Sequence, residues 1–433
     1  MKQLFFLFLA FLLLISQALP QQKVTAWKGA RIYTVEGNVI ENGVILSKGG
    51  IITAVGSAES VSIPSDAEVI DVEGRVIIPG LVDTHSHIGN GDGGDASSPT
   101  HPDVRILDSI DPRSDTFMRA RSGGITTVNV MPGSGHLLSG QTVYLKLTRT
   151  GKLQDMLYCD DPMTGICGGI KMANGTNSLR GAPFPGTRGK SASIVRQLFV
   201  KAQEYKKKVD AAGGNPEKMP KRDLEMESLV QVLEGKKIVH HHTHRNDDIL
   251  SVIRLQKEFG FKVVLHHVTE GWVVAEEIAK AGIPCSIIMI DSPGGKMETV
   301  NLAFENGALL EKAGVDVAYH TDDYITDSRH FLRSAALGVR GGMSFDKALE
   351  SLTLAGARML GLENRIGSLK TGKDADFVIL SGEPFSVYTK VEQTIVSGEV
   401  VFDRSRPDDY KYATGGYRVY KDLFYDHVHE EER

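Results

Sequence analysis

The sequence is poor in cysteine and in net charge, and both shortages limit what the protein can be. Three cysteines, Cys159, Cys167 and Cys285, are too few for a disulfide framework, and their odd number leaves at least one free thiol. Cys159 and Cys167 could pair in an oxidising compartment, although closeness along the chain does not ensure the distances that a bridge requires. A formal net charge of -5 gives no basic patch of the kind that nucleic-acid binding requires.

Several motifs of common enzyme classes are also missing. Glycine-rich segments occur, but no Lys-Ser or Lys-Thr follows them, as phosphate binding would need. Neither Ser86 nor Ser139 lies in a Gly-x-Ser-x-Gly elbow, so a serine nucleophile is not supported. No glycine-rich dinucleotide fingerprint follows the first strand of the central region.

The longest apolar run stands at the N-terminus. Residues 4–15 are all apolar, and they follow Lys2 and precede a more polar segment. This length is short for a membrane span and typical of the apolar region of a secretory signal. We expect residues 1–20 to be a signal peptide, cleaved after Ala18, and the mature protein to be exported to the periplasm or secreted. An uncleaved membrane anchor is the alternative, and no second transmembrane stretch is evident.

Two strand-rich segments flank a middle region with a different rhythm. Short strand patterns with Gly and Asn-Gly turns fill residues 23–78 and return at residues 361–404. Between them, residues 79–360 alternate apolar strand candidates with amphipathic helical ones. This order indicates parallel strands joined by right-handed crossovers, so we predict an α/β fold with a (β/α)8 barrel. A doubly wound open sheet is the alternative, and residues 405–433 are expected to form a C-terminal tail.

The most informative motif is a His-x-His at the end of the first strand of the middle region. Residues 76–82 form an apolar run without alternation that leads into Asp83, which suits a strand that is covered on both faces. Strand side chains repeat every second residue, so His85 and His87 point to the same side. Two imidazoles directed at one point predict a metal site. Two solvated loop histidines are the alternative.

Metal-competent side chains recur where the other predicted strands end. In a (β/α)8 barrel these ends meet at one face, which carries the active site, so the pattern predicts a metal site at the barrel mouth. Alternation alone leaves His240, His242 and His244 on one face without choosing among them. Eight of the 14 histidines occupy three strand ends, and a lysine and an aspartate occupy two more: His85, His87, His240, His241, His242, His244, His266, His267, Lys171 and Asp322.

The ordered motifs resemble the metal-dependent amidohydrolase superfamily. They are PGLVDTHSHIG, VHHHTHRNDDI, VLHHVTEGW, AYHTDD and GSLKTGKDADFVIL. More narrowly, they resemble the imidazolonepropionase-like amidohydrolases, a group that includes Xaa-Pro-type dipeptidases. The resemblance extends from about Val24 to Phe402. It implies that the two flanking β segments pair into one composite β-sandwich beside the barrel.

The resemblance also assigns roles to individual residues. Asp322, rather than Asp323, is implied as both a ligand and the catalytic base. His241 and His266 are expected to face the barrel wall. The implied metal ligands are His85, His87, Lys171, His242, His267 and Asp322. Near the mouth, His244 and Arg245 are weaker candidates for contact with the substrate.

Lys171 decides the expected number of ions. A carboxylated lysine would bridge two metals, whereas an unmodified lysine is a cation that cannot ligate and would be a structural charge. We expect the binuclear form. The following loop reads Gly175-Thr176-Asn177 where related sequences commonly have a glutamate, so no carboxylate is expected from it. The nitrogen-rich ligand set favours Zn2+, with Mn2+, Fe2+ and Co2+ as alternatives.

These ligands imply hydrolysis of an amide C–N bond by metal-activated water, with Asp322 as the general base. The expected partner is a small molecule, namely a dipeptide, an N-acyl amino acid or a cyclic amide. A non-catalytic metal- or ligand-binding barrel of the same fold is the alternative function. The sequence leaves open whether the chain forms a homo-oligomer.

Overall fold

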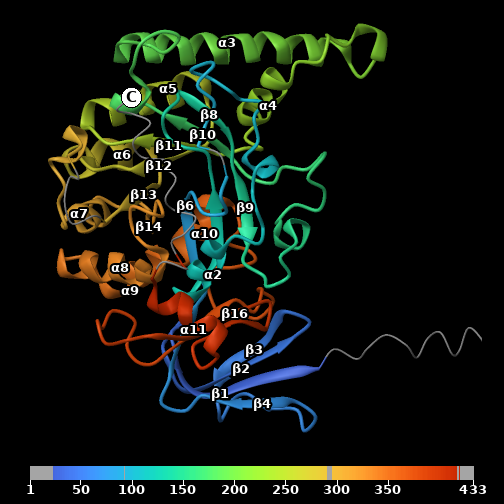
Figure 1. The fold of residues 1–433 in the computed structure, drawn as a ribbon, viewed down its shortest axis with the longest axis vertical. Helices are drawn as coiled ribbons and strands as arrows, with labels where there is room; N and C mark the ends of the chain where they lie inside the picture. The colour runs from blue at the N-terminus through green and yellow to red at the C-terminus, as the bar shows by residue number, and fades with distance from the viewer. Residues whose placement is uncertain (1–22, 92, 290–294, 417–418, 420–433) are drawn as a thin grey trace, which may run out of the picture.

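The computed structural model describes residues 23–91, 93–289, 295–416 and 419. The predicted signal peptide and most of the predicted tail lie outside the described residues. None of the helices in the described ranges combines the length and apolar character that a membrane crossing needs. Figure 1 shows the described chain as a strand-rich unit at the bottom of the view and a larger unit of helices and strands above it.

The two flanking segments form one eight-stranded sheet. Its strands follow the order β17-β16-β15-β5-β1-β2-β3, with β4 paired to β1. The segments meet where β5 pairs antiparallel with β15, through the register Ile78 to Val378. Trp27 is buried on this sheet, with its ring 4.9 Å from that of Phe377. The strands are β1 (Val24–Ile32), β2 (Ile40–Lys48), β3 (Ile51–Ser57), β4 (Glu68–Asp71), β5 (Val76–Pro79), β15 (Phe377–Leu380), β16 (Val391–Val396) and β17 (Glu399–Asp403).

Two further sheets make up the middle of the described chain. One has the order β6-β7-β9, and the other has the order β14-β13-β12-β11-β10-β8. Strand β6 is parallel to β7, and the strands from β10 to β14 are parallel to one another. The strands are β6 (Leu81–Ser86), β7 (Ile125–Val130), β8 (Leu138–Gln141), β9 (Val143–Lys146), β10 (Ile170–Ala173), β11 (Val239–Thr243), β12 (Val263–His267), β13 (Cys285–Ile288) and β14 (Val317–His320).

The strand expected near Tyr144 is present, but it runs in the opposite direction from its neighbours. Strands β8 and β9 are separated only by Thr142, and they pair antiparallel with β10 and β7, respectively. The physical reason is the short link of residues 131–137 after β7, because a parallel crossover needs a dozen residues or more. One bent segment therefore connects the two sheets.

The outer edges of these two sheets also meet. The backbone N–H of Asp322, just after β14, donates to the carbonyl of His85 in β6 at 2.9 Å. The backbone N–H of Thr321 donates to Asp83 Oδ1 at 3.0 Å. The middle region is thus an α/β arrangement of two sheets that meet near the histidines. Among the described strands, a continuous ladder of strand pairs around a closed barrel is not seen.

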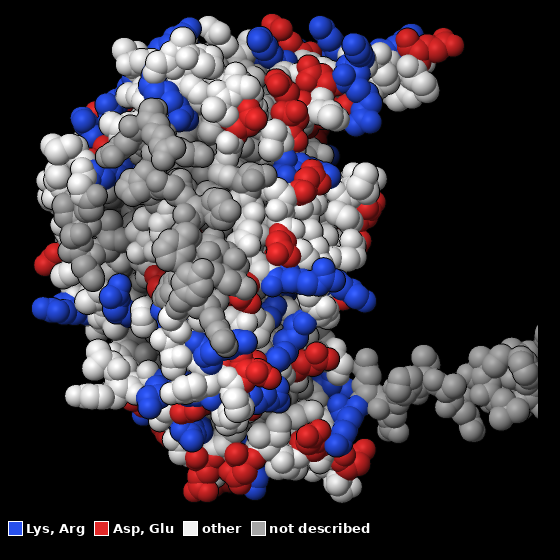
Figure 2. Space-filling model, viewed as in Figure 1, with Lys and Arg blue, Asp and Glu red and all other residues white. Residues whose placement is uncertain are grey.

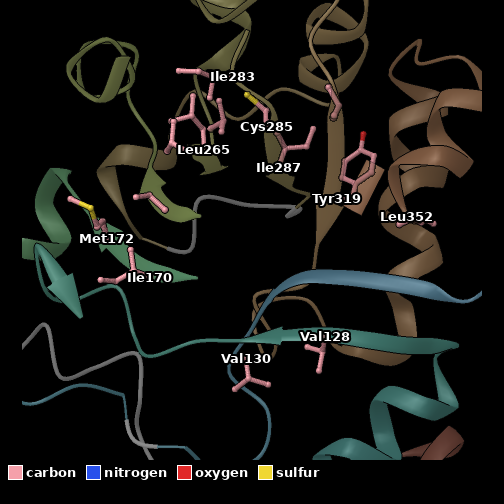
Figure 3. Close-up of a cluster of buried hydrophobic side chains, with 14 of the residues drawn as sticks. Val128, Val130, Ile170, Met172, Leu265, Ile283, Cys285, Ile287, Tyr319 and Leu352 are labelled. Carbon is pink, nitrogen blue, oxygen red and sulfur yellow. The ribbon is translucent and has the colours of Figure 1, made fainter. Parts of the chain in front are cut away.

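Helices cover the outer face of these sheets. Cys285 and Ile287 of β13 lie in the apolar cluster of Figure 3, together with Leu265 of β12 and Tyr319 of β14. Because strand side chains alternate, the intervening residues face the opposite side, where the histidines lie. The helices are α2 (Asp115–Ser122), α3 (Arg188–Ala212), α4 (Leu224–Leu233), α5 (Asn246–Phe259), α6 (Ala275–Ala281), α7 (Asn306–Lys312), α8 (Phe331–Arg340), α9 (Phe345–Ser351), α10 (Leu354–Leu360) and α11 (Pro407–Thr414).

The described part of the C-terminal segment packs against the body of the protein. Tyr412 of α11 donates a hydrogen bond from its hydroxyl to Asp115 of α2 at 2.9 Å.

Cys159 and Cys167 form a disulfide, and Cys285 is a buried free thiol, so the pairing that the sequence left open is made. On the face drawn in Figure 2, basic and acidic side chains are interspersed over α3 and α4.

Candidate metal centre

The end of β6 is fixed by a buried carboxylate. Asp83 accepts hydrogen bonds from the backbone N–H of Thr321 at 3.0 Å, from the Thr321 hydroxyl at 2.5 Å and from the backbone N–H of His85 at 3.3 Å. These contacts join the ends of β6 and β14, which carry candidate ligands. Burial raises the pKa of Asp83 to about 7, although the three hydrogen bonds favour its ionised form.

His85, His87 and Asp322 converge at this point. Asp322 Oδ1 lies 3.0 Å from His87 Nε2 and 3.4 Å from His85 Nε2. His87 Nδ1 lies 2.8 Å from the carbonyl oxygen of Met131, which can only accept, so this nitrogen carries the proton and Nε2 faces Asp322. Burial would raise the pKa of Asp322, but the neighbouring His87, His320 and Lys171 lower it to about 2. Asp322 is therefore a carboxylate at neutral pH.

Asp322 and Asp323 have different surroundings. Asp323 is fully buried, and its Oδ1 accepts a hydrogen bond from Arg119 at 2.6 Å. Its other oxygen accepts from the backbone N–H of Ser328 at 3.0 Å. Asp322 adopts a left-handed backbone conformation, with φ of 49°, where the chain turns after β14. Asp322 faces the histidines, whereas Asp323 is tied to α2 and to the loop before α8.

Lys171 lies beside this group. Its Nζ is 2.9 Å from His85 Nε2 and 3.1 Å from Met131 Sδ, and the side chain is fully buried. Burial lowers the pKa of Lys171 to about 7, against the opposing influence of Asp322. Near neutral pH, a large fraction of the amine is therefore uncharged, which is the form that can react with carbon dioxide to give a carbamate.

A second group consists of His242, His244 and His267, whose candidate ligand atoms lie within 4.8 Å of one another. The rings of His242 and His267 are 4.2 Å apart, and those of His242 and His244 are 4.6 Å apart. His244 Nδ1 lies 2.7 Å from the hydroxyl oxygen of Thr269. The two groups are thus built from β6 and β14 on one side and from β11 and β12 on the other.

The prediction that His266 faces the barrel wall is wrong. Leu265 points to the helices, so alternation directs His266 inwards, where its ring lies 5.0 Å from that of His85. His267 would then face outwards, but its left-handed φ of 69° departs from the extended form, and its Nδ1 lies 3.9 Å from Asp322. His241, by contrast, lines a pocket with residues of α3 and α5, on the predicted side.

His320 is a further site histidine that was not among the predicted ligands. Its Nε2 lies 3.2 Å from His267 Nδ1, and its Nδ1 lies 2.8 Å from the Ser286 hydroxyl oxygen. With His85 and His266 it forms a third group whose ligand atoms lie within 4.8 Å of one another. The spacing His-Thr-Asp at the end of β14 carried the signal, since His320 and Asp322 stand two residues apart, as His85 and His87 do.

Arg245 is not seen beside these histidines. Its guanidinium pairs with Asp247 at 2.9 Å near the surface, at the start of α5. His244, the other candidate for substrate contact, is buried within the second group.

The donor set fits a divalent metal. Both ring nitrogens of His242, Nε2 of His267 and Nδ1 of His85 are buried without a hydrogen-bond partner among the described residues. The ring of His267 lies 4.2 Å from that of His242 and 4.8 Å from that of His85. Buried polar atoms are normally paired, so unpartnered nitrogens on such closely spaced imidazoles indicate a missing ligand. Burial lowers the pKa of His85, His242 and His267 well below 6.5, which leaves the rings neutral, as metal ligation requires.

Comparison with known proteins finds similarity to amidohydrolases. A model of the amidohydrolase family matches residues 208–402. A crystal structure of an amidohydrolase from Thermotoga maritima MSB8 superposes with a TM-score of 0.80 at 32% identity, covering 88% of this chain and 100% of that one.

Curated relatives show similarity over most of the described chain. The amidohydrolase tasK of Hapsidospora irregularis is 28% identical over 396 residues, which is 83% of this chain but only 40% of the length of that relative. An imidazolonepropionase of Rhizobium rhizogenes is 25% identical over 396 residues, which cover 82% of this chain and 91% of that protein.

Proposed function

The chain belongs to the amidohydrolase family and is a hydrolase that acts on carbon–nitrogen bonds, and within that class we propose that it cleaves an amide bond with water activated at a divalent metal. The membership confirms the resemblance that the ordered motifs indicated. It favours a hydrolase over the alternative of a non-catalytic metal- or ligand-binding barrel. The proposed substrates are a dipeptide, an N-acyl amino acid or a cyclic amide. The observation that carries the proposal is the convergence of His85, His87 and Asp322 beside the unpartnered nitrogens of His242 and His267.

We propose that His85, His87 and Asp322 would hold one ion and that His242 and His267 would hold a second, with Lys171, if carboxylated, as a ligand to both. Zn2+ fits the imidazole-rich set best. A bound ion of this kind supplies a Lewis acid that polarises the substrate carbonyl and makes water a better nucleophile at neutral pH.

The residues of the chain supply positioning and proton transfer. Asp322 is ionised at neutral pH, so its carboxylate can accept a proton from the attacking water and pass it to the leaving nitrogen. Met131 fixes the tautomer of His87, and Asp83 fixes the end of β6, which carries both His85 and His87. His320 is oriented by Ser286, whose hydroxyl lies 2.5 Å from that of Thr84.

We propose that the protein is exported after cleavage of residues 1–20. The apolar run of residues 4–15 supports a signal peptide. The disulfide between Cys159 and Cys167 supports an oxidising compartment, because such bonds are rare in reducing cytosol. Expression of the full chain, followed by fractionation and N-terminal sequencing, tests this proposal. A cytoplasmic protein that retains Lys2 would contradict it.

Two measurements test the proposed reaction. Elemental analysis of the purified protein should find a divalent metal, at about two ions per chain if Lys171 is carboxylated. Turnover is then measured on dipeptides, N-acyl amino acids and cyclic amides, before and after removal of the metal by a chelator. Activity that depends on the metal supports the proposal. Metal-loaded protein that hydrolyses no member of the panel speaks against it.

A further inference from the structure

One charged side chain reaches the second histidine group from outside the strands. Lys296 Nζ lies 3.4 Å from His244 Nε2. The hydroxyl of Thr269 holds the other nitrogen of that ring, so His244 can accept from the ammonium through Nε2 while Nδ1–H donates to Thr269. The ring of His244 stacks on that of His267 at 4.9 Å. Lys296 is therefore one imidazole ring away from the candidate metal ligands.

Lys296 brings positive charge to a site made largely of neutral rings. Burial is the largest cause of the lowered pKa values of His244 and His242, and the charge of Lys296 lowers both further. The same charge also lowers the pKa of Lys171. An ammonium has three N–H donors, and a charged donor forms strong hydrogen bonds to a carboxylate. The substrate group that suits this position is an anion.

A pocket of about 220 Å³ lies on the far side of Thr269, among residues of β13 and the segment before α7. Thr269, which contacts His244 Nδ1, is part of its lining, so this one residue links the pocket to the His244 ring. The rest of its lining is mainly apolar and includes Ile288, Met289, Leu302, Ala303 and Phe304. An apolar cavity of about 150 Å³ suffices to bind benzene in another protein, so an aromatic or branched side chain fits this volume.

We propose that Lys296, positioned by His244, binds the free carboxylate of the substrate and that the pocket beside Thr269 receives its large apolar side chain. This inference rests on the proposed function and narrows it. It selects N-acyl amino acids and dipeptides that end in an aromatic or branched aliphatic residue, and it disfavours cyclic amides without a carboxylate.

A pair of ligands without an amide bond tests the carboxylate contact separately from hydrolysis. Isothermal titration calorimetry measures the binding of 3-phenylpropanoate and of 3-phenylpropan-1-ol to the protein as purified. We expect the carboxylate to bind about tenfold more tightly or better, as a charge-assisted hydrogen bond would give. Lys296→Gln should bring the two affinities close together, and Lys296→Arg should keep a preference. Lys312→Gln, which removes an exposed charge at the end of α7, serves as the matched control.

The outcomes separate this inference from the proposed function. A preference for the carboxylate that survives Lys296→Gln overturns the inference, because the carboxylate would then bind elsewhere, such as at the metal. Hydrolysis of amides without any effect of Lys296 on carboxylate preference overturns the inference alone. A preference that depends on Lys296 in a protein that hydrolyses no amide overturns the proposed function alone.

A second variant tests the pocket. Ala303→Phe adds a ring to the lining and should weaken the binding of 3-phenylpropanoate by about tenfold, while propanoate binds much as before. Equal weakening of both ligands, or no change in either, contradicts the assignment of the pocket to the side chain. Thermal unfolding of the variant checks that the fold is retained.

Discussion

The two histidine groups differ in what holds them. In the first, His87 is oriented by the Met131 carbonyl, and Asp322 lies within 3.4 Å of both His85 and His87. In the second, neither ring nitrogen of His242 has a partner among the described residues. The protein's own contacts therefore hold most of the first group, whereas in the second group they hold mainly His244, through Thr269. The second depends more on a bound ion to satisfy its buried nitrogens, since unpaired buried polar atoms are costly.

This difference separates two tasks within one site. A group that contains the carboxylate can bind an ion and also exchange a proton. A group made only of imidazoles can bind an ion but has no anionic base of its own. Substitutions in the two groups should therefore change different measurements.

The largest expected effect follows from Asp322→Asn. The amide keeps the size of the side chain but cannot accept the proton, so turnover should fall by about 10²-fold to 10⁴-fold. Asp346→Asn, at an exposed position in α9, is the matched control and should leave turnover unchanged. Steady-state kinetics and circular dichroism provide the comparison. A variant that is folded and fully active would remove Asp322 from the role of general base.

His242→Gln should break the second group while the first remains. We expect lower metal content and a smaller stabilisation by added metal, because a ligand that binds only the folded state stabilises it by mass action, by about 4 kcal/mol at 1,000 times its Kd. His241→Gln, next to it but facing α3 and α5, should keep both the metal and the stabilisation. Elemental analysis and thermal unfolding with and without chelator make the measurement. Equal metal loss in both variants would count against the division into two groups.

Lys171→Gln tests whether the two groups share a ligand. If the lysine is carboxylated between them, metal content should fall from about two ions to one, with a large loss of turnover. Lys237→Gln is a suitable control, because Lys237 is also buried with a lowered pKa but lies before β11. Carbon-13 NMR of protein supplied with labelled bicarbonate should show a carbamate signal in the wild type and not in Lys171→Gln. An unchanged metal count in that variant would contradict a bridging role.

The sequence predicted the first group more fully than the second. The alternation of a strand was enough to direct His85 and His87 to one point, and the structure has them together beside Asp322. The position of His267 could not be derived in this way, because its left-handed backbone depends on the turn after β12. His266 could have been placed, since the apolar Leu265 before it marks the face that meets the helices.

In the fold, too, the local sequence pattern predicted which segments are strands and helices but not how all of them are arranged. Alternating strand and helix patterns predicted an α/β middle region, and the flanking strand patterns correspond to one sheet shared by β5 and β15. The antiparallel direction of β8 and β9 was missed because periodicity identifies a strand without giving its direction. The seven-residue link before β8 was the available signal, since it leaves no room for a crossover helix.

The smallest expected effect concerns His320, which joins the two groups through its 3.2 Å approach to His267. Ser286→Ala removes the hydroxyl beside His320 Nδ1, which should free the ring to reorient and lower metal affinity by about tenfold. Stability should fall by only about 1 kcal/mol, the usual contribution of one hydrogen bond. Ser351→Ala removes a buried hydroxyl that donates to a helix carbonyl in α9, and it should cost similar stability without altering metal affinity. Equal metal affinities in the two variants would mean that His320 packs between the groups without orienting either of them.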